Sequence, residues 1–190
     1  MKLVSTKNQT RHNRIRHYIS AMILVLLGVM LDQYTKHLAV AHLKEQKPFV
    51  IFKNVFELQY LENKGAAFGL LQNQQFFFII SVVIISIVII WFYVRVPMDR
   101  KFLPLRLCAV FVMTGALGNC IDRISQGFVV DFFYFKLINF PIFNVADIYV
   151  TVATFLRAFL LIFDSKDADL DLIYRSQIKC YQDQKNLTST

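Results

Sequence analysis

The sequence predicts an all-α membrane protein with four transmembrane helices, and three observations support this fold class. The chain is 56% hydrophobic, contains 19 phenylalanines and has a mean hydropathy of +0.46. Its apolar residues come in long blocks, which is typical of bilayer-spanning segments, whereas soluble elements space them at helical or strand periods. Most Lys and Arg lie between or outside these blocks, as in the loops of a multi-pass protein.

The totals also exclude several kinds of function. The formal net charge of +8 does not indicate nucleic-acid binding, because the basic residues are placed as topology signals and as contacts for lipid head groups. Cys108, Cys120 and Cys180 show no CxxC or Cys/His spacing, and the four histidines share no helix face. We therefore expect no metal, no cofactor and no disulfide framework.

The first apolar run, residues 18–36, follows a polar, basic segment at residues 1–17. A basic start, an apolar core and the small triplet Ala39-Val40-Ala41 also fit a cleaved signal peptide. A retained helix is the better interpretation, because Asp32 and Lys36 fall between the apolar core and that triplet.

Three further runs complete the predicted membrane domain, residues 18–163. Residues 76–96 carry no charge before Arg95 and match a hydrocarbon core of about 30 Å at about 1.5 Å per residue. The remaining runs are residues 102–121, which include small residues suited to close helix packing, and residues 145–163. Residues 164–190 form a polar tail.

Between the first two runs, the sequence predicts short strands. Residues 49–52 and 55–61 alternate as half-buried strands do. Gly65 follows Asn63 in a stretch of small residues, Gly65-Ala66-Ala67-Phe68-Gly69, that permits a tight backbone path or a close approach to a ligand.

Four spans place both termini on one side of the membrane, and the basic residues close to the spans favour the cytoplasm. With this orientation, the polar residues at the span ends and in the outer loops converge near the outer surface. They are Asp32, Lys36, Asn63, Asn119, Asp122, Arg123, Asp131, Asn144 and Asp147. Ionisable groups at membrane depth are costly, so they are usually paired and functional. Arg157, in the middle of the last run, faces either the bundle interior or the inner interface.

Local structure alone explains some of these residues. We expect an ion pair between Asp122 and Arg123 that closes the third span, and a capping box in which Asp147 follows Asn144 by three positions. Asp131 has no such local explanation, because it is a lone carboxylate in an apolar, strand-like loop. Together with Asp147, it would form an acid–base pair that shares one proton.

Two other classes of function remain open for the same cluster. A small transporter is disfavoured, because the chain has no internal repeat and no polar group at mid-depth apart from Arg157. A non-enzymatic membrane scaffold would tolerate neutralisation of both Asp131 and Asp147.

Five short motifs, in order along residues 18–163, resemble the bacterial lipoprotein signal peptidases (signal peptidase II). They are Asp32-Gln33-Tyr34-Thr35-Lys36, Asn63-Lys64-Gly65-Ala66-Ala67-Phe68, Gly118-Asn119-Cys120-Ile121-Asp122-Arg123, Val129-Val130-Asp131-Phe132 and Phe143-Asn144-Val145-Ala146-Asp147. Each motif is weak alone, but the five together on four spans are specific.

The resemblance implies a small extracytoplasmic sheet within residues 49–68 and an aspartic endopeptidase of the inner membrane. The substrate would be a prolipoprotein whose signal peptide is cut just before a diacylglyceryl-modified cysteine. Asp131 and Asp147 would be the catalytic pair. The supporting or substrate-binding residues would be Asp32, Lys36, Asn63, Gly65, Asn119, Asp122, Arg123 and Asn144. We expect a monomer in contact with membrane lipids, with the active site near the outer leaflet.

Overall fold

The computed structural model describes residues 2–65 and 74–162, with side chains from residue 14 onward. It contains α1 (Lys2–Leu43), α2 (Gln75–Arg95), α3 (Leu103–Gln126) and a fourth helix, Val145–Ile162. The strands are β1 (Phe49–Phe52), β2 (Phe56–Asn63) and β3 (Val129–Tyr134), with short 3₁₀ turns η2 (Arg100–Phe102) and η3 (Lys136–Ile138). Three expectations lie outside the described residues: the stretch Ala66-Ala67-Phe68-Gly69, Cys180 and the tail 164–190. Residues up to Ala153 form one compact unit, which contains the site.

Four helices in the described part of the chain are long and apolar enough to cross a membrane. α2 shows most clearly why lipid is required: it is built of Phe, Ile and Val, and none of its residues is buried by the protein. Exposing this apolar surface to water would be unfavourable, whereas the lipid of a bilayer covers it. The helix also satisfies its own backbone hydrogen bonds, as a membrane span must. The predicted fold class, four membrane helices with a small sheet, is confirmed.

α1 extends beyond the predicted apolar run at both ends, from Lys2 to Leu43. No glycine or proline interrupts residues 2–17 or 37–43, so the polar flanks continue the helix. The last turns of α1 therefore reach the sheet, where Ala39 packs against Val130 and Phe132 of β3. On the fourth helix, Arg157 is exposed.

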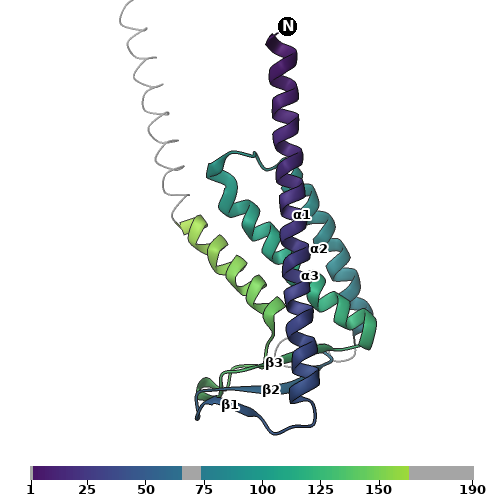
Figure 1. The fold of residues 1–190 in the computed structure, drawn as a ribbon, viewed down its shortest axis with the longest axis vertical. Helices are drawn as coiled ribbons and strands as arrows, with labels where there is room; N and C mark the ends of the chain where they lie inside the picture. The colour runs from purple at the N-terminus through teal and green to yellow at the C-terminus, as the bar shows by residue number, and fades with distance from the viewer. Residues whose placement is uncertain (1, 66–73, 163–190) are drawn as a thin grey trace, which may run out of the picture. The chain divides into compact units, whose positions relative to one another are not determined.

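The three strands form an antiparallel sheet in the order β1-β2-β3, beside the C-terminal end of α1 (Figure 1). The register of β2 and β3 pairs Leu61 with Asp131 and Asn63 with Val129. An isolated bridge between Phe133 and Phe143 then brings the start of the fourth helix alongside β3. The sheet thereby places segments from three parts of the chain at one end of the helices.

Two glycines of α3 permit close packing with its neighbours. A Cβ at Gly118 would lie 2.5 Å from Asp32 Oδ2 and 3.3 Å from Ala146 Cβ, and one at Gly115 would collide with the Ala146 carbonyl oxygen. α1 and the fourth helix therefore approach α3 closely because these positions carry no side chain. The predicted packing role of small residues in this helix agrees with these contacts.

Candidate active site

Asp131 lies on β3 with its side chain turned away from the core. Its neighbours Val130 and Phe132 pack toward α1, so the alternation of the strand directs Asp131 and Val129 to the opposite face, where both line a cavity. Only 1% of Asp131 is exposed. Asn63 Nδ2 donates to its Oδ2 at 2.8 Å, and Asn144 Nδ2 donates to its Oδ1 at 2.6 Å.

Asp147 lies in the first turn of the fourth helix and is held by a reciprocal cap. The Asp147 amide donates to Asn144 Oδ1 at 3.0 Å, and the Asn144 amide donates to Asp147 Oδ2 at 3.1 Å. This is the expected capping box, with Asn144 as the cap and Asp147 three residues on. The same Asn144 side chain contacts Asp131, so one residue fixes the position of both carboxylates.

Asn119 of α3 connects the two aspartates to α1. Its Nδ2 donates to Asp147 Oδ1 at 2.9 Å, and its Oδ1 accepts from Asn144 Nδ2 at 3.1 Å. The same oxygen accepts a hydrogen bond from Lys36 Nζ at 2.9 Å.

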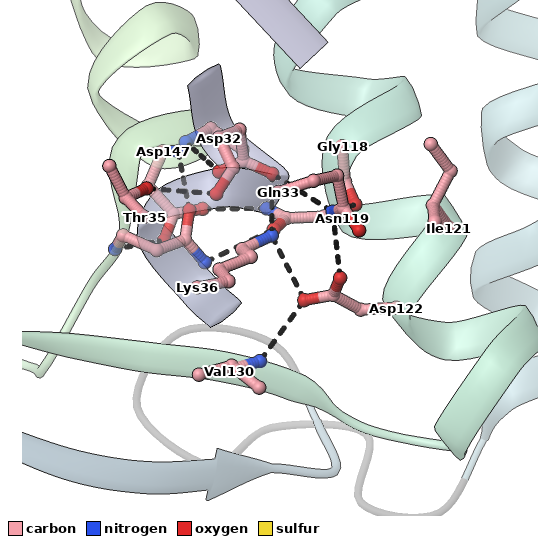
Figure 2. Close-up of polar contacts among 12 residues, drawn as sticks. Asp32, Gln33, Thr35, Lys36, Gly118, Asn119, Ile121, Asp122, Val130 and Asp147 are labelled. Atoms are coloured by element: carbon pink, nitrogen blue, oxygen red, sulfur yellow. Dashed lines mark hydrogen bonds and ion pairs between the residues drawn. The ribbon is translucent and has the colours of Figure 1, made fainter. Parts of the chain in front are cut away.

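Behind Asp131 and Asp147 lies a cluster of three charged residues and one glutamine, which we call the α1–α3 cluster. It consists of Asp32, Gln33, Lys36 and Asp122 (Figure 2). Lys36 Nζ lies 2.9 Å from Asp32 Oδ2 and 3.0 Å from Asp122 Oδ2. Gln33 Nε2 donates to Asp122 Oδ1 at 2.8 Å, to the Gly118 carbonyl oxygen at 3.1 Å and to Asp32 Oδ2 at 3.2 Å.

The two aspartates of this cluster also hold backbone amides of other elements. Asp32 Oδ1 accepts from the Ala146 amide at 2.8 Å, so a carboxylate of α1 caps the N-terminus of the fourth helix. Asp122 Oδ2 accepts from the Val130 amide at 3.2 Å, which ties α3 to β3. The predicted ion pair between Asp122 and Arg123 is wrong: Asp122 pairs with Lys36, because adjacent residues on a helix point in different directions.

Arg123 instead bridges α3 to the chain after β2. Its guanidinium donates to the Gly65 carbonyl oxygen at 3.0 Å and lies 4.3 Å from the centre of the Phe78 ring on α2. The Gly65 amide in turn donates to Asn63 Oδ1 at 3.0 Å, which orients the carboxamide that contacts Asp131. The Arg123 Nε atom is buried and has no hydrogen-bond partner among the described residues.

A cavity of about 900 Å³ lies between the sheet, the end of α3 and the start of the fourth helix. Its lining includes six of the ten residues expected in the site: Asn63, Gly65, Asn119, Arg123, Asp131 and Asp147. Its apolar wall includes Phe140, Ile142 and Val152. The other four predicted residues, Asp32, Lys36, Asp122 and Asn144, are buried and do not line the cavity.

The surroundings of Asp131 favour its protonated form. Burial, followed by the charge of Asp147, raises the pKa of Asp131 to about 7, although hydrogen bonds from Asn63 and Asn144 and the charge of Lys36 oppose this rise. A protonated Asp131 on the same cavity as a second carboxylate, Asp147, suits general acid–base chemistry near neutral pH. Among residues 2–65 and 74–162, no three His, Cys, Asp or Glu side chains are grouped to hold a metal ion.

The sequence did not single out Gln33 as part of the site. It is uncharged, and its role depends on tertiary structure. Gln33 can bridge Asp32 and Asp122 only because the packing of α1 on α3 brings these two aspartates together. Its place three positions before Lys36 on the same helix was the available signal.

Known protein families are similar to this chain over most of its length. The family model described as signal peptidase (SPase) II matches residues 24–163. The lipoprotein signal peptidase of Caldanaerobacter subterraneus subsp. tengcongensis is 40% identical over 144 residues, which cover 75% of this chain and 96% of that protein. The lipoprotein signal peptidase of Symbiobacterium thermophilum is 44% identical over 134 residues, 70% of this chain and 87% of that protein.

A solved structure is also similar. A bacterial membrane enzyme determined by the in meso method at 2.3 Å resolution superposes with a TM-score of 0.69 at 30% identity, over 78% of this chain and 90% of that one. The family match covers more than half of the chain and includes every residue discussed in the site. The chain therefore belongs to the signal peptidase II family and is a multi-pass bacterial membrane protease.

Proposed function

We propose that the chain is an aspartic endopeptidase that removes the signal peptide from prolipoproteins, cutting just before a lipid-modified cysteine. The observation that supports this most strongly is the joint positioning of two carboxylates on one cavity wall. Asn144 donates to Asp131 at 2.6 Å and forms the capping box with Asp147. Asp131 accepts from the side chains of Asn63 and Asn144, whereas Asp147 accepts from the side chain of Asn119 and the backbone amide of Asn144. A pair of carboxylates held in this way suits acid–base catalysis.

In the proposed reaction, Asp147 is ionised and takes a proton from a water molecule as the water oxygen attacks the scissile carbonyl carbon. Asp131 begins protonated, consistent with its raised pKa, and donates its proton to the developing oxyanion. When the tetrahedral intermediate collapses, the carbon–nitrogen bond breaks and the leaving amine takes up the proton held by Asp147. Asp131 recovers its proton from the hydroxyl as the new carboxyl group forms.

Three neighbours would hold the pair in this arrangement. Asn63 and Asn144 bind one oxygen each of Asp131, and Asn119 binds Asp147. Arg123 lines the same cavity and has a buried N–H that no described residue accepts, so it could bind a carbonyl oxygen of the substrate.

The cavity also suits a substrate that arrives within the membrane. Polar groups form one wall, whereas Phe140, Ile142 and Val152 form an apolar wall that would accept a membrane-embedded peptide or an acyl chain. The matched relatives are lipoprotein signal peptidases, and their name points to a prolipoprotein substrate. With both termini in the cytoplasm, the cavity would lie near the outer leaflet, where a secreted precursor exposes its cleavage site.

The substrate class is tested by incubating the purified protein in detergent with a diacylglyceryl-modified prolipoprotein and with the same precursor lacking the lipid. Cleavage of the lipidated form alone, just before the modified cysteine, is the expected result. Equal cleavage of both forms would contradict the lipid requirement. Failure of the folded protein to cleave either form would contradict the proposed activity, and substrate flux in liposomes would then test the transporter alternative.

A further inference from the structure

The α1–α3 cluster contains one cation, Lys36, whose three protons all have partners. The Nζ atom lies 2.9 Å from Asp32, 3.0 Å from Asp122 and 2.9 Å from Asn119 Oδ1. Only 3% of Lys36 is exposed, so water contributes little to its solvation. The contacts with Asp32 and Asp122 neutralise buried charge. The contact with Asn119 connects Lys36 to Asp147, because Asn119 also donates to Asp147.

The contact with Asn119 determines which end of that side-chain amide faces which partner. A lysine ammonium group can only donate, so it selects the oxygen of the carboxamide. The Asn119 NH₂ group is then left facing Asp147, to which it donates at 2.9 Å. In the flipped orientation, the amide would place its NH₂ group against the ammonium and its oxygen against the carboxylate, which are two repulsive contacts.

Asn144 reinforces the same orientation. Its Nδ2 also donates to Asn119 Oδ1, at 3.1 Å, and its own direction is fixed because its Oδ1 accepts from the Asp147 amide. The oxygen of Asn119 thus accepts two donors, one of them charged. Donors on the oxygen of an amide polarise it and strengthen the bond that its NH₂ group makes.

We propose that Lys36 is a positioning residue for the catalytic pair and acts on Asp147 through the carboxamide of Asn119. This inference rests on the proposed aspartic mechanism. It assigns to Lys36 a second task in addition to neutralising Asp32 and Asp122. A bond from a polarised Asn119 favours the ionised carboxylate of Asp147, which is the form required to take a proton from water.

The charge of Lys36 also acts on Asp131. Its positive charge lowers the pKa of Asp131, opposing burial and the charge of Asp147. Other ionisable groups face the pair or lie directly behind it. They are Asp32 on α1, Glu62 on β2 with Lys64 after it, Tyr134 on β3, and Asp122 and Arg123 on α3. Unlike these groups, Lys36 donates to the side-chain oxygen of Asn119, whose NH₂ group donates to Asp147.

A purely structural role for Lys36 is the alternative, and a single Lys36→Met variant would not separate the two. It would leave Asp32 and Asp122 buried without their cation, which is strongly destabilising. The sharper comparison is between Asp122→Asn, which retains Lys36, and Lys36→Met/Asp122→Asn, which removes one cation and one anion together. Gln33→Leu is the matched control, since Gln33 contacts both aspartates of the cluster but not Asn119 or Asp147.

Each variant is purified in detergent, checked for its melting temperature, and assayed for turnover number, KM and pH dependence with a lipidated prolipoprotein. Relative to Asp122→Asn, the double variant is expected to lose about tenfold or more in turnover number with little change in KM. Its pH–rate profile should move to higher pH, because the pKa of Asp131 rises without the lysine charge. Gln33→Leu should lower the melting temperature and leave the pH profile in place.

Introducing Lys36→Met into Asn119→Ala/Asp122→Asn tests the route through Asn119. If Lys36 acts through that side chain, the turnover losses at Lys36 and Asn119 are not additive. Fully additive losses would overturn the route. Should the methionine variant fail to fold, Lys36→Gln/Asp122→Asn keeps a donor but removes the charge, and its pH profile should still shift.

The results distinguish this inference from the function on which it rests. If Asp131→Asn cleaves as well as the unmodified protein, the proposed function fails and the inference fails with it. If the Asp131 and Asp147 variants are inactive while Lys36→Met/Asp122→Asn matches Asp122→Asn in turnover and pH profile, only the inference is overturned.

Discussion

Asn144 donates a 2.6 Å hydrogen bond from its side-chain amide to Asp131, across from the fourth helix to β3. The opposite end of the same amide accepts the Asp147 backbone N–H at 3.0 Å. A helix cap and a contact to a strand carboxylate are thus combined in one side chain. Local stability and the geometry of the site therefore depend on the same residue.

Two substitutions of Asn144 separate these roles. Asn144→Ser retains an N-cap but cannot reach Asp131 and Asn119, so we expect a near-normal melting temperature and a strong loss of turnover. Asn144→Ala should lose the turnover and also about 0.5–2 kcal/mol of stability, because the cap is gone. Thermal unfolding and cleavage assays on both proteins check this. Full activity in folded Asn144→Ser would contradict the assigned contact.

The pH dependence of cleavage should show the titration of the pair. Below a pH of about 7, Asp131 holds its proton, which is the form that the proposed mechanism requires of it. As pH rises through that value, Asp131 loses the proton, so activity should fall by about tenfold per pH unit on the alkaline side. Initial rates measured from pH 5 to about 9 test whether activity falls as the pH rises. Activity that keeps rising through the alkaline range would be inconsistent with a protonated Asp131.

Gly118→Ala tests the close approach of α1 to α3. The added methyl group would meet Asp32 Oδ2 at 2.5 Å, so we expect a loss of about 1–3 kcal/mol and lower turnover as the α1–α3 cluster shifts. Gly127→Ala is the matched control: its Cβ meets no atom within 4 Å, but its φ of +78° is strained for alanine. It should lower stability by about 1 kcal/mol and leave turnover unchanged. Equal turnover in the two variants would contradict the packing argument.

Much of the fold follows from local sequence patterns. The apolar runs predicted the helices, and residues 49–52 and 55–61, read as alternating strands, correspond to β1 and β2. The end of α1 was harder to predict, because polar residues can continue a helix beyond the bilayer without any apolar signal. The pairing of β3 with β2 joins residues far apart in the chain, so its register required the structure.

The site shows the same division. The Asn144–Asp147 cap is local and was predicted from its spacing. The partner of Asp122 is set by packing: the adjacent Arg123 was the expected partner, but Lys36 on another helix occupies that place. Gln33 was missed for the same reason: it donates to Asp32 and Asp122, which meet only when α1 and α3 pack together.

The most direct test of the account is the turnover of Asp131→Asn and Asp147→Asn on a lipidated prolipoprotein, each variant first shown to be folded by its melting temperature. We expect each variant to lose about 10²–10⁴-fold or more, as removal of a general acid or base does. Glu57→Gln is the control: Glu57 is a buried carboxylate on the same sheet that pairs with Lys136 and does not line the cavity, so its loss should leave turnover near normal. Near-normal cleavage by either folded aspartate variant would contradict the catalytic pair.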